Sequence, residues 1–477
     1  MRLALRVFAL VALGSALLAA AHEHHDELSE EEANAPVDAI LWVHIFLQAA
    51  VWGILFPIGM VLGLSGSRWH VPLQTTGIVL TLGGYLLGHK HGGRAFLKSV
   101  HGTFANLVLI PILLQVALGI YLKLHIHERT LRPYAVKAHG VVGKAYPIIG
   151  WVQMLFGAIA FRGYCRGGHL GQCLAHYIMG SGFVAYGTII AIMLLVGENW
   201  VRRSGKSPEW WDSWVILLWG IVNTFTEHHG GSWSVKDMQH TIMGVLWWCG
   251  GILGIYLARS NTRTVVPSII IILTGWAMSS HAQALMISTQ VHAMFGYTLM
   301  LAGLTRAIEV CFVAPHFAPL EVDDAGSEHT LGGGEETPAQ SSGRAFRHLP
   351  AFLLVCGGLL FMSATDEELQ YIHGTGMDHV TYILIMFSLG FLIYTHILFC
   401  INLYATSGRN APSMVAAKHS ALESPGEIEL AETPITTRAP WYSRVASRPR
   451  VQAHDRTSSS APLVGPAHVI GDEDDEE

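Results

Sequence analysis

The chain has 477 residues, of which 51% are hydrophobic and only 13% are charged. Soluble domains carry about 25% charged residues, so this composition excludes an ordinary soluble protein and predicts an all-α integral membrane protein in contact with the lipid bilayer. The net charge of −6 offers no basic surplus for nucleic acid, whereas 27 histidines nearly equal the 29 lysines and arginines.

The N-terminal segment, 1–21, has the pattern of a secretory signal peptide. Arg2 and Arg6 supply the charged start, residues 7–18 the apolar stretch, and the alanines ending at Ala21 the cleavage site. We therefore expect a membrane of the secretory route: endoplasmic reticulum, vacuole or plasma membrane. An uncleaved first helix is the alternative.

Apolar runs with few charged residues after this segment predict about eleven transmembrane helices in two bundles. The runs cover residues 39–64, 71–88, 101–124, 140–161, 176–197, 211–226, 241–258, 265–283, 286–312, 349–364 and 380–404. A helix needs about 20 residues to cross the hydrocarbon layer, so the sixth and tenth runs are short. With the N-terminus outside, thirteen lysines and arginines fall in inner connections and six in outer ones, which favours a cytosolic C-terminus.

The runs divide into two membrane domains. Residues 38–197 are predicted to form a first bundle of five helices, and residues 209–404 a second domain of six, interrupted by a flexible linker at 315–348. Residues 405–477 end in an acidic run and are expected to form a disordered cytosolic tail. Cys165 and Cys173 share a predicted outer loop, where they either form a disulfide or remain reduced.

Four histidines occupy the same position, near the start of each of the first four helices. Since helices alternate in direction, His44 and His101 are predicted at the outer face, and His70 and His139 at the inner face. Two imidazoles facing each other in a bundle are natural axial ligands of haem iron, so we predict two b-type haems. The alternatives are interfacial histidines bonded to backbone or water, or zinc, for which two histidines are too few.

The sequence around these histidines resembles the haem helices of cytochrome b-561 type membrane reductases. The matching stretches are Trp42-Val43-His44 with Trp52 to Gly59, Trp69-His70 with Gly77 and Gly84, His101-Gly102 with Gln115 and Gly119, and His139-Gly140 with Gly143 and Tyr146. The resemblance implies that the first histidine pairs with the third and the second with the fourth. Over its full length the chain resembles the fungal Ytp-type transmembrane proteins.

A second group of histidines lies on the predicted outer side of the second domain. His240 and His292 open the seventh and ninth helices and repeat the positions of the first and third histidines, and His281 and His379 lie at the same side. Imidazole suits zinc, copper and iron, so this group is a candidate site for a third haem or a transition metal. The alternative is a set of interfacial polar residues.

These features predict one-electron transfer across the membrane, from a cytosolic donor to an outer acceptor such as ferric or cupric ion, by a haem-dependent oxidoreductase. One alternative is a metal-ion binding or transport protein that captures ions with the outer histidines and with His22, His24 and His25. The other is a cofactor-free structural membrane protein. A transporter normally has polar groups at the bilayer midplane, and the runs contain almost none.

Overall fold

The computed structural model describes residues 28–226, 228, 232–280, 283–313, 343 and 345–414. The predicted signal peptide lies outside these residues, as do most of the predicted 315–348 linker and nearly all of the predicted tail. Every described residue belongs to one compact unit.

Regular structure in the described part is helical, apart from one isolated bridge between Val37 and Gly93. The long or span-forming helices are α3 (Ala39–Ala50), η1 (Val51–Leu55), α4 (Phe56–Leu64), α5 (His70–Lys90), α6 (Val100–Lys123), α7 (Arg132–Arg162), α8 (Leu170–Leu195), α10 (Pro208–Thr226), α11 (Val235–Leu257), α12 (Val266–Ser279), α13 (Met286–Ile308), η3 (Glu309–Val313), α15 (Leu349–Met362), α16 (Asp366–Gly374) and α17 (His379–Thr406). A helix stands at each of the eleven predicted runs, so the all-α expectation is confirmed.

The predicted number of eleven spans is not confirmed. Among the described residues, eight helices are long and apolar enough to cross a membrane, and a ninth span is counted if α15 and α16 are taken together. These two helices meet at a bend of 76°. Helix α12 has only 14 residues, about 21 Å of rise against a hydrocarbon layer of about 30 Å. Helix α10 carries Glu209 and Asp212 and is rich in tryptophan, which lowers its hydropathy.

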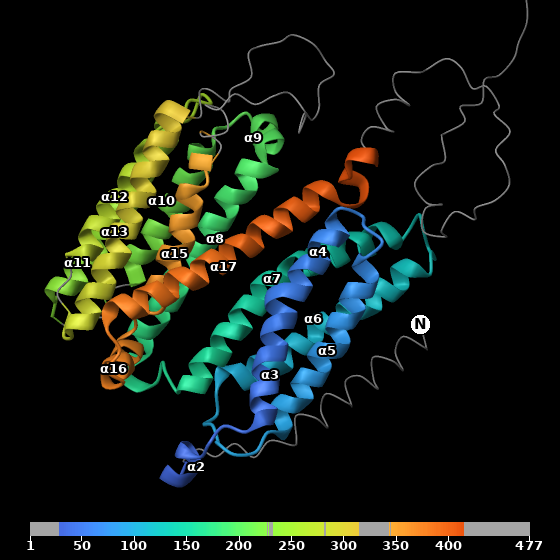
Figure 1. Ribbon diagram of the computed structural model, residues 1–477. Helices are drawn as coiled ribbons and strands as arrows, with labels where there is room; N and C mark the ends of the chain where they lie inside the picture. The colour runs from blue at the N-terminus through green and yellow to red at the C-terminus, as the bar shows by residue number, and fades with distance from the viewer. Residues whose placement is uncertain are drawn as a thin grey trace, which may run out of the picture. The chain divides into compact units, whose positions relative to one another are not determined.

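The first helical group contains α3 to α7, in which α3, η1 and α4 form one continuous span. This span packs against α5, and α6 packs against α7 (Figure 1). The core that joins the two hairpins is aromatic: the ring of Tyr146 lies 5.5 Å from that of Trp52 and 5.2 Å from that of Phe56. The indole N–H of Trp52 donates to Thr81 Oγ1 at 2.8 Å, so this buried polar group is satisfied.

Helix α8 does not close the first bundle, contrary to the prediction for residues 38–197. It packs along α15 in the second group instead, through glycines that bring the two backbones together. A Cβ on Gly180 would lie 2.5 Å from the carbonyl oxygen of Gly358, and a Cβ on Gly358 would lie 2.5 Å from that of Gly180. Close backbone approach at small residues is a strong determinant of helix pairing in membranes, which explains the different partner.

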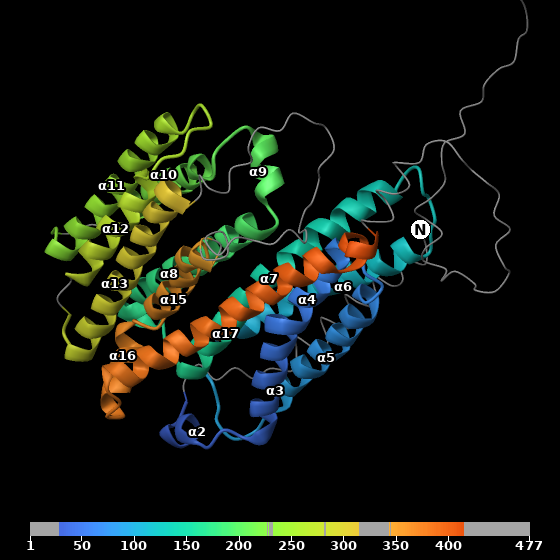
Figure 2. The same cartoon turned by 45° about the horizontal axis from the view of Figure 1, so that its top comes forward.

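Helix α17 links the two groups. It contacts α15 and α8 on one side and α4 on the other, and in both views it runs between the groups (Figures 1 and 2). At its end, the Ser407 hydroxyl lies 2.8 Å from the Ser65 hydroxyl, and the backbone N–H of Arg409 donates to the carbonyl of Ser65 at 2.8 Å.

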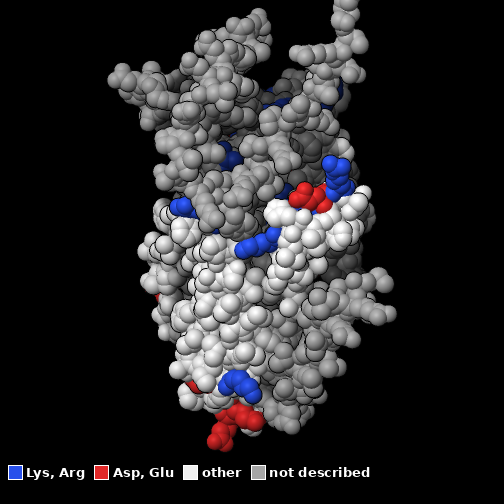
Figure 3. All heavy atoms as spheres, turned by 90° about the vertical axis from the view of Figure 1, so that its right-hand side faces the viewer, with Lys and Arg blue, Asp and Glu red and all other residues white. Residues whose placement is uncertain are grey.

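The surface is consistent with a membrane environment. The face in Figure 3 has few charged side chains over its middle, while lysines, arginines and carboxylates gather toward its two ends. Large apolar side chains are exposed along the helices of the first group, such as Phe46, Val79 and Ile110 at 64–67%. In water such a surface would be costly, whereas lipid covers it without penalty.

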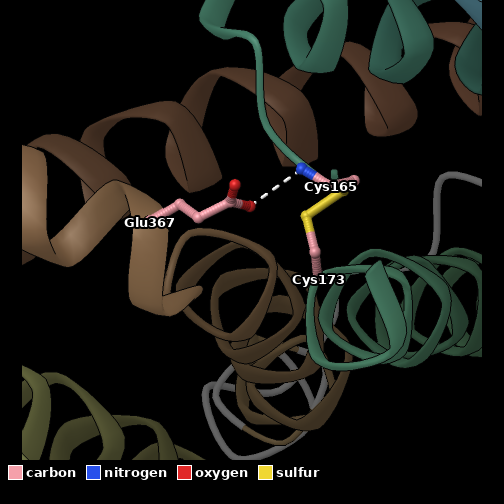
Figure 4. Close-up of side chains that lie close together, drawn as sticks. All are labelled: Cys165, Cys173 and Glu367. Carbon is pink, nitrogen blue, oxygen red and sulfur yellow. Dashed lines mark hydrogen bonds between the residues drawn. A yellow bond between two sulfur atoms is a disulfide. The ribbon is translucent and has the colours of Figure 1, made fainter. Parts of the chain in front are cut away.

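A disulfide joins Cys165, in the connection between α7 and α8, to Cys173 in the first turn of α8, so the first of the two predicted alternatives is the one observed. Glu367 of α16 approaches this bond, and its carboxylate accepts a hydrogen bond of 2.8 Å from the backbone N–H of Cys165 (Figure 4). The guanidinium of Arg162 lies 3.6 Å from the centre of the Tyr371 ring and fixes the same loop to α16.

Candidate functional site

The structure brings together the same two histidine pairs that helix parity predicts. The ring centres of His44 and His101 lie 6.2 Å apart with their planes at 82°. Those of His70 and His139 are also 6.2 Å apart, with their planes at 88°. One pair lies at each end of the first group, because antiparallel neighbours alternate their starting ends.

Hydrogen bonds orient three of the four rings. Nδ1 of His44 lies 2.7 Å from the carbonyl oxygen of Gly84, and Nδ1 of His70 lies 2.8 Å from that of Gly59. Nδ1 of His101 lies 3.3 Å from the carbonyl oxygen of Gln153. A carbonyl only accepts, so Nδ1 carries the proton and Nε2 keeps its lone pair for a metal. Nδ1 of His139 is buried without a hydrogen-bond partner in the described part of the chain.

Each ring lies against a glycine of the neighbouring helix. A Cβ on Gly88 would lie 2.6 Å from His44, and one on Gly63 would lie 2.7 Å from His70. A Cβ on Gly157 would lie 3.1 Å from His101, and only Gly119 leaves ordinary space, 3.8 Å from His139. The glycines Gly63, Gly88, Gly119 and Gly157 therefore form a cradle for the histidine rings, which we call the glycine cradle.

Regular spacing places a histidine and a cradle glycine on one face of each helix. The interval from histidine to glycine is identical in α5, α6 and α7, where the pairs are His70 with Gly88, His101 with Gly119, and His139 with Gly157. It corresponds to about five full α-helical turns and about 27 Å of rise, close to the thickness of the hydrocarbon layer. This interval separates the two histidine pairs along the helices by nearly the full length of the first group.

The first span keeps this pattern by means of its π-helical turn. Gly63 follows His44 at an interval that is longer by a single residue than in the other helices, and η1 lies between them. A π-turn accommodates one extra residue, so the glycine returns to the face of the histidine. Of the four cradle glycines, only Gly119 belongs to the motifs predicted from the sequence, although the spacing of the other three is also visible there.

The geometry of both pairs fits axial ligation of one metal by two imidazoles. A metal–nitrogen bond of about 2.0 Å plus about 1.1 Å from nitrogen to ring centre, taken twice, gives about 6.2 Å between the centres. All four rings are only partly buried. The most apolar segments of α6 and α7 are each 11% buried inside the structure, compared with 44% for that of α13.

The predicted metal group of the second domain is not assembled as expected. His292 lies against His176 of α8, with 3.4 Å between the two Nε2 atoms, and is not paired with His240. His379 begins α17 behind its cap residue, and His281 lies outside the described residues. Within the described ranges, the one group of three potential metal ligands is Cys165, Cys173 and Glu367, in which the two sulfurs are bonded to each other (Figure 4).

Sequence reasoning missed His176, which it placed only at the edge of a span. A signal was present, because His176 is the seventh residue of α8 and His292 is the seventh residue of α13. The partner of His292 could not be foreseen, because it depends on the unexpected position of α8.

A buried ionic cluster at the other end of the second group was also missed. Glu209 and Glu309 are 1% and 2% exposed. Arg263 donates to both oxygens of Glu209 at 2.8 and 2.9 Å, and Arg306 adds a third bond to Glu209 at 2.9 Å. Arg306 and Arg347 both bind Glu309. The sequence predicts these arginines as loop charges, but their bonds tie α10 and α13 to the segments just before α12 and α15.

The fold and the histidine pairs define a helical membrane protein of several spans, with paired histidines at both ends of its first helical group. The sequence profile described as "Protein YTP1-like, C-terminal" matches residues 149–405, more than half of the chain. A second profile, described as a domain of unknown function (DUF2427), matches residues 6–125. The chain therefore belongs to the Ytp1-like family of membrane proteins.

Individual relatives support this assignment. The chain is 46% identical over 261 residues to Protein YTP1 of Saccharomyces cerevisiae, a match that covers 54% of this chain and about half, 52%, of that protein. It is 19% identical over 480 residues to an uncharacterized membrane protein of Schizosaccharomyces pombe, covering 72% of this chain and 90% of the relative. A second S. cerevisiae protein, an uncharacterized membrane protein, is 27% identical over 190 residues, a match that covers 34% of this chain and 27% of that protein. No solved structure matches the chain.

The family matches place the candidate residues in different segments. His44, His70 and His101 fall within the 6–125 match, whereas His139 lies between the two matches. His176 and His292 both fall within the 149–405 match.

Proposed function

We propose that this protein transfers single electrons across its membrane, using two haems that are each held by a pair of histidines. The observation that carries the proposal is the matched geometry of the two pairs, with 6.2 Å between ring centres at both ends of the first group. The resemblance of the same four helices to cytochrome b-561 type membrane reductases supports it. The charge bias of the connections favours an orientation with one pair toward the cytosol and the other toward the outside. In this proposal the donor is cytosolic and the acceptor, such as ferric or cupric ion, lies outside.

Backbone carbonyl groups orient three of the four proposed ligands, His44, His70 and His101. The carbonyl groups of Gly84 and Gly59 accept from Nδ1–H of His44 and His70, which directs Nε2 away from its neighbouring helix. Such a hydrogen bond also raises the basicity of the ligating nitrogen. The glycine cradle lets the rings approach the neighbouring backbone, so that both members of a pair face the space between the hairpins.

Glutamine side chains fix the register of the second hairpin. Gln153 donates to the backbone carbonyl of His101 at 3.1 Å, and Gln115 donates to that of His139, also at 3.1 Å. Each glutamine thereby ties one ligand-bearing helix end to the neighbouring helix. In the first hairpin Gln48 donates to the carbonyl of Thr81 at 3.0 Å and serves the same purpose.

The interval between the two sites is filled by the aromatic core of Trp52, Phe56 and Tyr146. Their rings lie 4.8–5.5 Å apart and are 0–5% exposed, so they exclude water from the middle of the bundle. A bound haem supplies the reversible one-electron chemistry, and the protein sets its ligation, burial and potential.

The test is the absorption spectrum and haem content of the purified full-length protein. We expect about two b-type haems per chain, a strong Soret band and a reduced α band. His127→Gln, at an exposed histidine outside both pairs, is the matched control and should keep the full content. A folded, monodisperse protein without haem would overturn the proposal. It would then favour the metal-binding or the cofactor-free alternative, according to whether metal is bound.

A further inference from the structure

A third histidine pair lies in the second group and differs from the other two. The Nε2 atoms of His176 and His292 are 3.4 Å apart, and the ring centres are 5.7 Å apart with planes at 84°. The two side chains come from α8 and α13, and their residues are only 8% and 3% exposed. The pair is independent of the two haem sites proposed above.

The hydrogen bonds of this pair define where its protons lie. Nδ1 of His176 is 2.8 Å from the carbonyl of Gln172, and Nδ1 of His292 is 2.9 Å from the carbonyl of Ser288. Because a carbonyl only accepts, each Nδ1 carries the proton and each neutral ring has its lone pair on Nε2. Two lone pairs that face each other at 3.4 Å repel, unless a cation lies between them.

The surroundings leave no room for a porphyrin. The ring of Phe361 stacks on His176 with 4.5 Å between centres, and Phe295 packs on Phe361 at the same distance. The contact of Gly180 with Gly358 brings α8 against α15 just one turn further along α8. The two histidine pairs of the first group are partly exposed, whereas this pair is enclosed by side chains, so its ligand must be small.

We propose that His176 and His292 bind a single copper(I) ion between their Nε2 atoms. Imidazole is a good copper ligand, and the closed-shell monovalent ion is satisfied by two nitrogens in a line, whereas zinc requires about four ligands. Two bonds of about 2 Å place the nitrogens about 4 Å apart, so the rings separate by about 0.6 Å on binding. The single charge of copper(I) also costs less to bury than that of a divalent ion.

The experiment measures copper(I) binding to the full-length protein in lipid nanodiscs, by competition with a chromophoric copper(I) chelator under reducing conditions. X-ray absorption at the copper edge then reports the ligands. We expect one copper(I) per chain with a linear two-nitrogen shell. His176→Gln and His292→Gln should each weaken binding at least tenfold. His379→Gln, at a histidine that begins another helix, is the matched control and should bind like the unaltered chain.

A second substitution distinguishes a metal ion bound between the two rings from a proton shared by them. Methionine is a ligand for copper(I) but cannot take a proton at this position, so His292→Met should retain copper with a nitrogen–sulfur shell. Chromatographic monodispersity and haem content of the same samples show whether the variants fold, and both should be unchanged. The proposal is overturned if the unaltered chain binds copper(I) no more tightly than the double variant His176→Gln/His292→Gln. That result would assign the contact to a shared proton, and it would leave the haem proposal untouched.

Discussion

Replacing Gly88 by alanine tests the glycine cradle without removing a ligand. The new Cβ would lie 2.6 Å from Cε1 and 2.7 Å from Nδ1 of His44, whereas ordinary contacts begin at 3.4 Å. The ring must therefore recede by about 0.8 Å, the difference between 3.4 and 2.6 Å. A shift of this size away from α5 lengthens the bond from Nδ1 to Gly84 from 2.7 Å to as much as about 3.5 Å, where little hydrogen bonding remains.

The expected consequence is selective loss at one site. Overpacking of this kind costs about 1–3 kcal/mol, which corresponds to an affinity for haem that is roughly five- to 150-fold lower. Haem content should fall from two toward one per chain, and the remaining low-temperature spectrum should match that of His44→Ala. The measurement is haem quantification in purified protein, followed by titration with haem.

The matched control is Gly83→Ala on the same helix. A Cβ on Gly83 meets no atom within 4 Å, so this variant should keep both haems and gain about 0.5–1 kcal/mol of helix stability. Equal haem content and affinity in Gly88→Ala and the unaltered chain would refute the cradle. Equal losses in the two alanine variants would refute it as well, because the effect would then be general to α5.

Three further predictions concern the ligands, the ionic cluster and the topology. His44→Ala and His101→Ala should each remove the same haem, and the double variant should be little worse than either single, because both residues serve one site; His44→Ala combined with His70→Ala should remove both haems. Glu209→Gln removes the buried carboxylate that Arg263 and Arg306 bind, while Arg306 keeps Glu309, and it should lower the free energy of unfolding by about 1–3 kcal/mol, measured by denaturant titration. Ser458→Cys in the tail should be labelled by an impermeant maleimide only from the cytosolic side of sealed vesicles.

Each of these predictions has an outcome that contradicts it. If His44→Ala and His70→Ala affect the same haem, the assignment of pairs to membrane faces is wrong. If Glu209→Gln is as stable as a substitution at exposed Glu128, the ionic cluster does not join the helices. If Ser458→Cys is labelled in right-side-out vesicles, the proposed orientation is inverted.

Local properties of the sequence were sufficient to place the helices and the first two histidine pairs. An uncharged run long enough to cross a membrane is helical, because lipid offers no other partner for the backbone. Helix direction then alternates along the chain, so the end at which His44 or His139 lies follows from counting. Neither step requires knowledge of which helices touch, and both agree with the structure.

Only the tertiary structure decided which helix packs on which. Helix α8 leaves the first group for α15 because Gly180 and Gly358 permit a backbone contact that sequence order does not reveal. The partner of His292, His176, depends on that contact. The sequence alone predicts the three arginines of the ionic cluster as loop charges. Glu209 and Glu309 lie far apart in the sequence, and the fold brings them to the same arginine.

The first span shows where prediction from the sequence ends and the packing of helices decides. A constant interval of about five helical turns between histidine and glycine is present in the sequence of three helices, where it places both residues on one face. In the first helix the interval is longer by a single residue, and the sequence alone predicts a glycine rotated by about 100° from that face. The π-turn over Val51–Leu55 removes the difference. Trp52 within this turn and Phe56 just after it both pack against Tyr146 of another helix, so the turn lies at a tertiary contact that the sequence does not reveal.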